Sequence, residues 1–321
     1  MSPIGAVQPQ RQVETGGLVF DSARVNTEFL AYRHTTETFL RGLDLLNDVV
    51  DGNIAHGMLL NALWCLELAP GVQPKHSLIL PGEWSGPMSI HDLARALSLP
   101  YSTVHRQLRQ LTESGQAART GGGTTVIAPQ FLQSDAARIF RQRSIASFVR
   151  LMLNLHRIGY VAGDVGILER EAGMTTQQED IVFRTAMETL LSCLLLTARF
   201  FDDLVTGLVF TLVATANIKQ LTNAPHSLAT MSAEVPDELR RPISVYNVAR
   251  ALHLPYETTR RIAKHLIQRN IFKQANGCGL FVPSEVHRQT ENADTQRASF
   301  QALAASVAQL ECAGLKLRLQ S

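Results

Sequence analysis

Two short stretches of the chain place hydroxyl, aromatic and cationic side chains at nearly the same spacing. One stretch begins at Tyr101 and the other at Tyr256. Hydroxyl groups can bond phosphate oxygens, and one Arg guanidinium can bond both O6 and N7 of guanine. Side chains of these types could therefore contact the phosphates and base edges of double-stranded DNA, a role that depends on the fold that presents them. The predicted contact residues are Tyr101, Ser102, Thr103, His105, Arg106 and Arg109 in the first stretch, and Tyr256, Thr258, Arg260, Arg261, Lys264 and His265 in the second.

A cation and several glycines follow each stretch. Arg119 precedes the run Gly121–Gly123, and Lys273 precedes Gly277 and Gly279. Because glycine has no side chain, a backbone amide at such a position can approach a phosphate closely. We therefore add Arg119 and Lys273 to the predicted DNA-binding residues.

The motifs of common enzyme and metal sites are missing from the sequence. The ten histidines show no HExxH spacing, GxSxG is absent, and TGGGTT lacks the Lys of a phosphate-binding P-loop. Asp202 and Asp203 border an apolar stretch and are interpreted as a cap at a helix break. Cys278 is a candidate for oxidation, but little in the sequence would activate its thiol. We expect no enzymatic activity, no cofactor and no metal site.

Both stretches belong to a longer repeat. Pro81–Leu111 aligns without a gap with Pro236–Leu266 at an offset of 155 residues, and 14 of the 31 positions are identical. Weaker matches continue upstream at offsets of 150 and 151 and downstream at 154. Small changes of offset are expected where loops differ in length. The sequence therefore indicates one domain of about 150 residues that is present twice. Each repeat is too long, and the copies are too few, for a solenoid.

Each copy is predicted to begin with helices. Over residues 29–46 apolar side chains recur at three- and four-residue steps, as an amphipathic helix requires. Arg33 and Glu37 are four residues apart and are expected to pair on the helix surface. Arg184 and Glu188 repeat this spacing in the second copy.

The repeated segment itself predicts a helix, a tight turn, a second helix and a β-hairpin. Ser89 is a suitable N-cap with Asp92 three residues later, and Ser244 with Asn247 imitates it. The residue before Pro100 is disfavoured in helical geometry, which places the turn there. The inward residues are predicted to be Leu93, Ala94, Leu97, Val104, Leu108 and Leu111, and the outward residues of the second helix are predicted to be Thr103, His105, Arg106, Gln107 and Arg109.

A helix, a tight turn, a helix and a hairpin form a winged helix-turn-helix. The sequence SIHDLARALSLPYSTVHRQLRQLTESGQAAR resembles the DNA-binding module of bacterial IclR-type and MarR-type regulators, over residues 88–129 and again over 243–283. The resemblance implies that the second helix enters the DNA major groove while the first crosses the backbone. The flanking helices resemble no known effector domain.

Some roles stay open at this stage. Tyr101 and Tyr256 either pack the turn or contact phosphate through their hydroxyls. Arg95 and Arg250 bond either the carbonyls of the turn or DNA.

The overall composition limits the class of protein. The 321 residues carry a net charge of +2, with 45% apolar and 18% charged residues, which excludes a disordered chain and a broadly basic histone-like binder. Four widely spaced cysteines fit a reducing cytosol. Thr189–Ile218 is strongly apolar but carries Arg199, Asp202 and Asp203, so a buried helix is expected there rather than a membrane span.

The sequence predicts a mainly α fold with small β-hairpin wings, in which two winged helix-turn-helix domains with flanking helices are related by an internal pseudo-two-fold duplication. Helices over 136–156 and 293–315 are expected to form the interface between the copies. The predicted divisions are a mobile tail at 1–20, repeat 1 at 21–135 with its winged helix at 76–131, connecting helices at 136–175, repeat 2 at 176–288 with its winged helix at 236–286, and a C-terminal helix at 289–321.

These features predict a cytoplasmic bacterial transcription regulator that binds double-stranded DNA. Most such regulators are homodimers because a palindromic operator needs two DNA-binding modules, and here the duplication would supply both covalently. The alternative is a non-enzymatic scaffold that docks partner proteins on its winged helices. A small-molecule effector and further oligomers remain open, and no membrane partner is expected.

Overall fold

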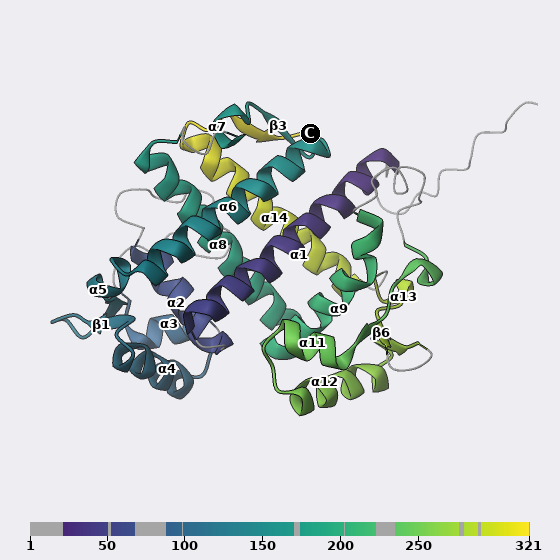
Figure 1. The fold of residues 1–321 in the computed structure, drawn as a ribbon, viewed down its shortest axis with the longest axis horizontal. Helices are drawn as coiled ribbons and strands as arrows, with labels where there is room; N and C mark the ends of the chain where they lie inside the picture. The colour runs from purple at the N-terminus through teal and green to yellow at the C-terminus, as the bar shows by residue number, and fades with distance from the viewer. Residues whose placement is uncertain are drawn as a thin grey trace, which may run out of the picture.

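The computed structural model describes residues 22–50, 53–67, 88–97, 99–169, 174–201, 203–222, 235–275, 279–287 and 290–320. The described chain is mainly helical, with three small antiparallel sheets (Figure 1). The predicted tail at 1–20, the roles of Asp202 and Cys278 and most of the Pro-rich segment before Met88 lie outside the described residues.

Two long helices lie at the centre of the molecule, and each is followed by a shorter apolar helix (Figure 1). The helices are α1 (Ser22–Val50), α2 (Ile54–Glu67), α8 (Thr176–Phe201) and α9 (Leu204–Thr222). Each short helix packs against its own long helix and against the long helix of the other half. The Asn53 side chain accepts from the amides that begin α2, and Asp203 caps α9 in the same way, as predicted for a helix break.

The long helices α6 (Asp135–Arg157) and α14 (Thr290–Cys312) do not pair with each other. α6 packs along α1 and α8 and so contacts both halves of the chain, whereas α14 packs mainly along α8. The physical reason is that the apolar faces of α1 and α8 occupy the centre, so the later helices cover them from outside. The role of both helices at the interface between the copies stays a prediction.

A small sheet, which the sequence did not predict, joins the ends of these two helices. Gly159 and Gly314 have φ of +75° and +80°, a left-handed conformation that ends each helix and turns the chain into a strand. The strands β3 (Val161–Gly163) and β7 (Leu317–Leu319) pair antiparallel. Their register is symmetric about the pair Ala162 and Arg318.

Two peripheral segments show the same order of elements. Each has a short helix, a turn, a longer helix and a hairpin, and we refer to them as the first unit (α3 to β2) and the second unit (β4 to β6). The first contains α3 (Ile90–Ala96), α4 (Tyr101–Glu113), β1 (Ala117–Arg119) and β2 (Thr125–Ile127); the second contains β4 (Ile243–Ser244), α11 (Val245–Ala251), α12 (Tyr256–Gln268), β5 (Lys273–Gln274) and β6 (Gly279–Phe281). The remaining short helices are α5 (Pro129–Leu132), α7 (Gly166–Glu169), η1 (Asp237–Leu239) and α13 (Ser284–His287).

Local sequence explains why these units fold as they do. Ser89 accepts from the Asp92 amide at 3.1 Å, and Ser244 accepts from the Asn247 amide at 3.2 Å, as predicted. The six predicted inward residues of the first unit are all buried: Leu93, Ala94, Leu97, Val104, Leu108 and Leu111.

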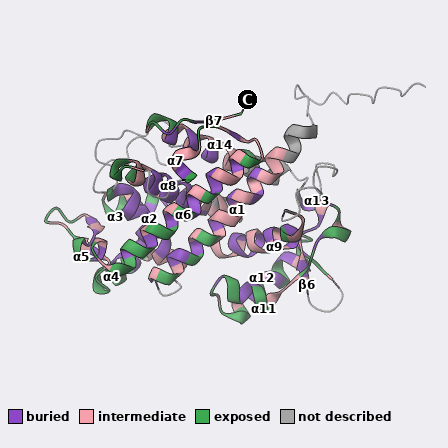
Figure 2. Ribbon diagram, turned by 45° about the horizontal axis from the view of Figure 1, so that its top comes forward, coloured by how far each residue is buried: buried purple, intermediate pink, exposed green. Residues whose placement is uncertain are grey.

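An aromatic cluster fixes the core beside the first unit. Trp64 of α2 stacks on Phe140 of α6 at 4.8 Å between ring centroids and meets Phe183 of α8 edge-on at 5.7 Å. α2, which packs against α4 and β2 of the first unit, is thereby joined to α6 and α8. Figure 2 shows α2 mostly buried, whereas the outer faces of the units are exposed.

The predicted ion pairs are present, but three of their four side chains are buried and Glu37 is only partly exposed, so their predicted place on the surface is wrong. Arg33 donates to Glu37 at 3.0 Å with only 1% of its side chain exposed, and it also donates to the carbonyl of Ile218 at 3.3 Å. Arg184 and Glu188 are 2.8 Å apart and are 9% and 6% exposed. Arg33, Arg184 and Glu188 are covered because α1 and α8 are the central helices, with neighbours on several sides.

Two helical segments, Thr176–Ala198 and Leu204–Leu221, are long and apolar enough to cross a membrane by length and composition alone. Burial within the protein accounts for the first of them, because 61% of its most apolar window is buried. Core helices of soluble proteins pass the same test, so these segments are weak evidence for a membrane.

Candidate nucleic-acid interface

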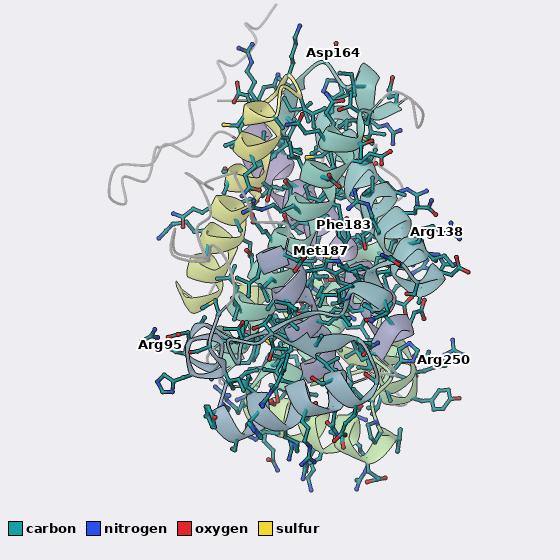
Figure 3. The ribbon with its side chains drawn as sticks, turned by 90° about the vertical axis from the view of Figure 1, so that its left-hand side faces the viewer. Arg95, Arg138, Asp164, Phe183, Met187 and Arg250 are labelled. Carbon is teal, nitrogen blue, oxygen red and sulfur yellow. The ribbon has the colours of Figure 1, made fainter. Side chains whose placement is uncertain are left out.

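Helices α4 and α12 lie on the same side of the molecule. Both run along the lower edge of Figure 1, and the view from the side in Figure 3 again places them together at the lower end. Arg95 and Arg250 project from this end in opposite directions (Figure 3). The two units therefore present their longer helices to a common surface.

Twelve of the fourteen predicted residues lie on these two helices, and Arg119 and Lys273 lie on the hairpins that follow them. Twelve of the fourteen are exposed, and Thr103 and Thr258 are partly buried. Gln107 was predicted to face outward, and this is wrong: it is 6% exposed and accepts a hydrogen bond from Asn53 Nδ2 at 3.4 Å. The side chain is covered because α2 packs against this face of α4.

Four positions form a matching stripe along each helix, because residues three and four apart share one helix face. The pairs of equivalent positions are Ser102 with Glu257, His105 with Arg260, Arg106 with Arg261, and Arg109 with Lys264. Glu257 was not among the predicted residues. The spacing of the stripe identifies it, whereas the predicted set holds only hydroxyl, aromatic and cationic side chains.

The cations of this surface fall into two groups, those that pair with an acidic side chain and those that do not. Arg109 pairs with Glu113 at 3.4 Å and Arg260 pairs with Glu257 at 2.9 Å, all four side chains being exposed. Across the residues that the structure describes, the cations without an acidic partner include Arg106, Arg119, Arg261 and Lys264.

Lys273, at the start of the second hairpin, also has an acidic partner. It pairs with Glu285 at 2.9 Å, and the hydrogen bond with Glu285 raises its pKa. The side chain is 49% exposed. Lys273 therefore stays a cation on the surface.

The tyrosines that begin the two helices are exposed rather than packed into the turn. Tyr101 is 51% exposed and stacks on His105 at 6.0 Å, with His91 of α3 at 6.4 Å. Tyr256 is 48% exposed. Arg95 pairs with the exposed Asp92 at 2.7 Å rather than with a carbonyl of the turn, and its contact with DNA stays a prediction.

Comparison with known families identifies a domain in the first unit. Residues 82–121 match the family model of the IclR helix-turn-helix domain. The chain therefore contains an IclR-type helix-turn-helix, a DNA-binding domain of bacterial transcription regulators. No curated protein and no solved structure gives a significant match to the chain.

The IclR-type match spans α3, α4 and β1 and reaches the wing. The wing is a tight hairpin. The hydroxyls of Thr120 and Thr124 are hydrogen-bonded to each other at 2.7 Å, and the Thr120 amide donates to the Thr124 carbonyl. Gly123 has φ of +78°, and an added Cβ there would meet no atom within 4 Å. The glycines leave the tip of this wing open to an approaching ligand backbone.

Other chemistry is less well supported in the described part of the chain. No group of three or more His, Cys, Asp or Glu residues there could hold a metal ion. Burial raises the pKa of the Cys65 thiol well above its usual value and that of Cys193 to about 12. Both thiols stay protonated at neutral pH, and a protonated thiol is a poor nucleophile.

A small cavity lies where α1, α6 and α8 meet. Its volume is about 30 Å³, and its lining includes Ser144 and Ser147, whose buried hydroxyls have no hydrogen-bond partner among the described residues. This space suits a water or two, whereas pockets for drug-sized ligands occupy roughly 300–1,000 Å³. It does not identify an effector site.

Proposed function

We propose that the chain is a sequence-specific DNA-binding transcription regulator whose first and second units are two winged helix-turn-helix domains acting as an intramolecular dimer. The observation that carries the proposal is the placement of α4 and α12 on one side of the molecule, each with an exposed Arg, Arg106 or Arg261, at the same position (Figure 1). In this proposal α4 and α12 both enter the major groove of one duplex.

The surface is suited to both kinds of DNA contact. Arg106 and Arg261 have no acidic partner among the described residues, so their guanidinium groups can bind guanine, whose major-groove edge accepts two hydrogen bonds from one Arg. Arg119 at the wing and Lys264 at the end of its stripe would neutralise phosphates. Arg109 and Lys273 would exchange exposed carboxylate partners for phosphates, at little cost because exposed ion pairs contribute only about 0–1 kcal/mol.

Matching details in the two halves support an internal pseudo-two-fold duplication. Helix crossings are one example: an added Cβ at Gly57 would approach Leu46 and Val50, and one at Gly207 would approach Thr197 and Phe201, which are the positions 151 residues later. The helix caps and the symmetric register of β3 and β7 agree with the same relation. A two-fold axis through an antiparallel strand pair is the arrangement of an isologous dimer.

We further propose the divisions given by the repeat, with winged helices at 76–131 and 236–286 and long helices that bring them together. The regulator would be a cytoplasmic, non-enzymatic protein. One chain would bind an operator with two half-sites, which a single-domain regulator binds only as a dimer.

The competing function is a scaffold that docks proteins on its winged helices. An interface core is usually depleted of charge, and the outer faces of α4 and α12 are instead rich in exposed Arg, Lys and His. The charge therefore favours nucleic acid over protein.

The test is capture of genomic DNA fragments by the full chain, followed by sequencing and by titration of a captured duplex at several salt concentrations. We expect affinity to fall steeply with salt, each neutralised phosphate adding about −0.9 to the log–log slope. Arg106→Ala with Arg261→Ala should abolish selective capture. Arg138→Ala, which removes an exposed Arg from α6, is the matched control and should leave it intact. No capture at low salt, or a flat salt dependence, would support the scaffold.

A further inference from the structure

Glu257 places an acidic group among the cations of α12. It lies in the first turn of the helix, and its side chain is 71% exposed. With Thr258, Arg260, Arg261 and Lys264 it lines an open hollow on the outer surface of the helix. The equivalent position on α4 is Ser102, so the carboxylate distinguishes the second unit from the first.

Arg260 holds one oxygen of this carboxylate and leaves the other available. Both Nε and Nη2 of Arg260 lie 2.9 Å from Oε2 of Glu257. Within the described ranges, Oε1 has no hydrogen-bond partner. The ion pair therefore orients the carboxylate, and Oε1 is presented outward as an acceptor.

Electrostatics decides which part of a duplex this oxygen can meet. A carboxylate is repelled by phosphates, so on a DNA-facing stripe it is tolerated only at a base edge. In the major groove the hydrogen-bond donors are the N4 amino group of cytosine and the N6 amino group of adenine, while guanine and thymine present acceptors. Adenine also presents the acceptor N7 beside its donor, which repels the carboxylate, and cytosine does not.

Resting on the proposed function, we propose that Glu257 is a specificity-determining residue that selects cytosine at one position of the half-site bound by the second unit. Oε1 accepts a hydrogen bond from the N4 amino group, and Arg260 fixes the carboxylate for that contact. Ser102 can donate as well as accept, so the first unit makes no such selection. The two half-sites therefore differ at this position.

The experiment is selection of duplexes from a random library by the full chain, followed by sequencing. Wild type should enrich cytosine about tenfold at one position of one half-site. Glu257→Gln should shift the preference to adenine, because an amide can pair with N6 and N7 together. Glu257→Ser should remove the preference. Ser102→Glu combined with His105→Arg, which supplies the orienting guanidinium, should create a cytosine preference in the other half-site.

The control is Glu169→Gln, which removes an exposed carboxylate from α7, on the side opposite to α4 and α12 (Figure 1). It should reproduce the wild-type selection. A wild type that enriches no sequence removes the proposed function and this inference together. A wild type that enriches a site whose cytosine survives Glu257→Gln overturns this inference alone. Loss of all binding in both Glu257 variants, with unchanged melting, overturns it as well, because Glu257 would then be needed for affinity rather than for selection.

Discussion

Arg106 on α4 and Arg261 on α12 occupy the same position of their helices, and both are exposed without an acidic partner among the described residues. Their neighbours on each stripe differ: His105 stands where the second unit has Arg260. The two units thus have the same Arg at one position and different residues beside it. They would therefore bind half-sites that are related in sequence but not identical.

This relation predicts the effect of removing each Arg. Arg106→Ala should relax base selectivity in one half-site only, and Arg261→Ala in the other. If the contact is bidentate to guanine, each loss should cost about 1–3 kcal/mol at that position. Lys264→Ala should instead weaken binding to all sequences alike, because a phosphate contact carries no base information. Footprinting of a captured fragment measures all three, and unchanged protection of both half-sites by the two Arg variants would contradict the assignment.

The buried ion pair of α8 leads to a prediction about stability. Glu188 accepts from Arg184 at 2.8 Å and from Gln309 of α14 at 2.6 Å. Glu188→Ala leaves the Arg184 charge buried without its carboxylate, and we expect a loss of about 3–5 kcal/mol in the free energy of unfolding.

The matched control for Glu188 is Asp135→Ala. It breaks the exposed pair with Arg138, where the side chains are 85% and 59% exposed, and should cost less than about 1 kcal/mol. Urea unfolding followed by circular dichroism compares the two variants. Equal losses in the free energy of unfolding would show that the buried pair of α8 contributes no more to stability than an exposed pair.

Acid should weaken the fold through His34. Burial lowers its pKa, and Arg33 and Arg157 lower it further while Glu37 opposes them. The unfolded chain, with a His pKa near 6.5, then takes up the proton first, so the free energy of unfolding should fall as the pH drops below about 6.5. His34→Gln should flatten this part of the curve of stability against pH. An unchanged slope in that variant would assign the acid sensitivity to other groups.

Much of each unit was predictable because its signals are local. Ser89 caps α3 through its own neighbours, and Pro100 places the turn by steric exclusion alone. The arrangement of α1, α6, α8 and α14 could not be predicted. Amphipathic periodicity indicates which face of a helix is buried, but it does not identify the helix that covers that face. Gln107 shows the same limit: its burial depends on α2, which lies far away in sequence.

Gly57 and Gly207 lie at the two equivalent helix crossings, and we expect an alanine substitution to affect stability differently at each. A Cβ at Gly207 would lie 2.5 Å from Cγ2 and 2.9 Å from the carbonyl oxygen of Thr197, closer than such contacts allow. Gly207→Ala should therefore push α8 and α9 apart and cost about 1–3 kcal/mol. At Gly57 the nearest atom is Leu46 Cβ at 3.4 Å, an ordinary contact, and Ala gains about 1 kcal/mol of helix propensity over Gly. Gly57→Ala should be neutral or slightly stabilising. Thermal unfolding of both variants decides between them: equal effects would mean that the two crossings are equally tight and that the closer approach of α9 to α8 is not a real difference between the halves.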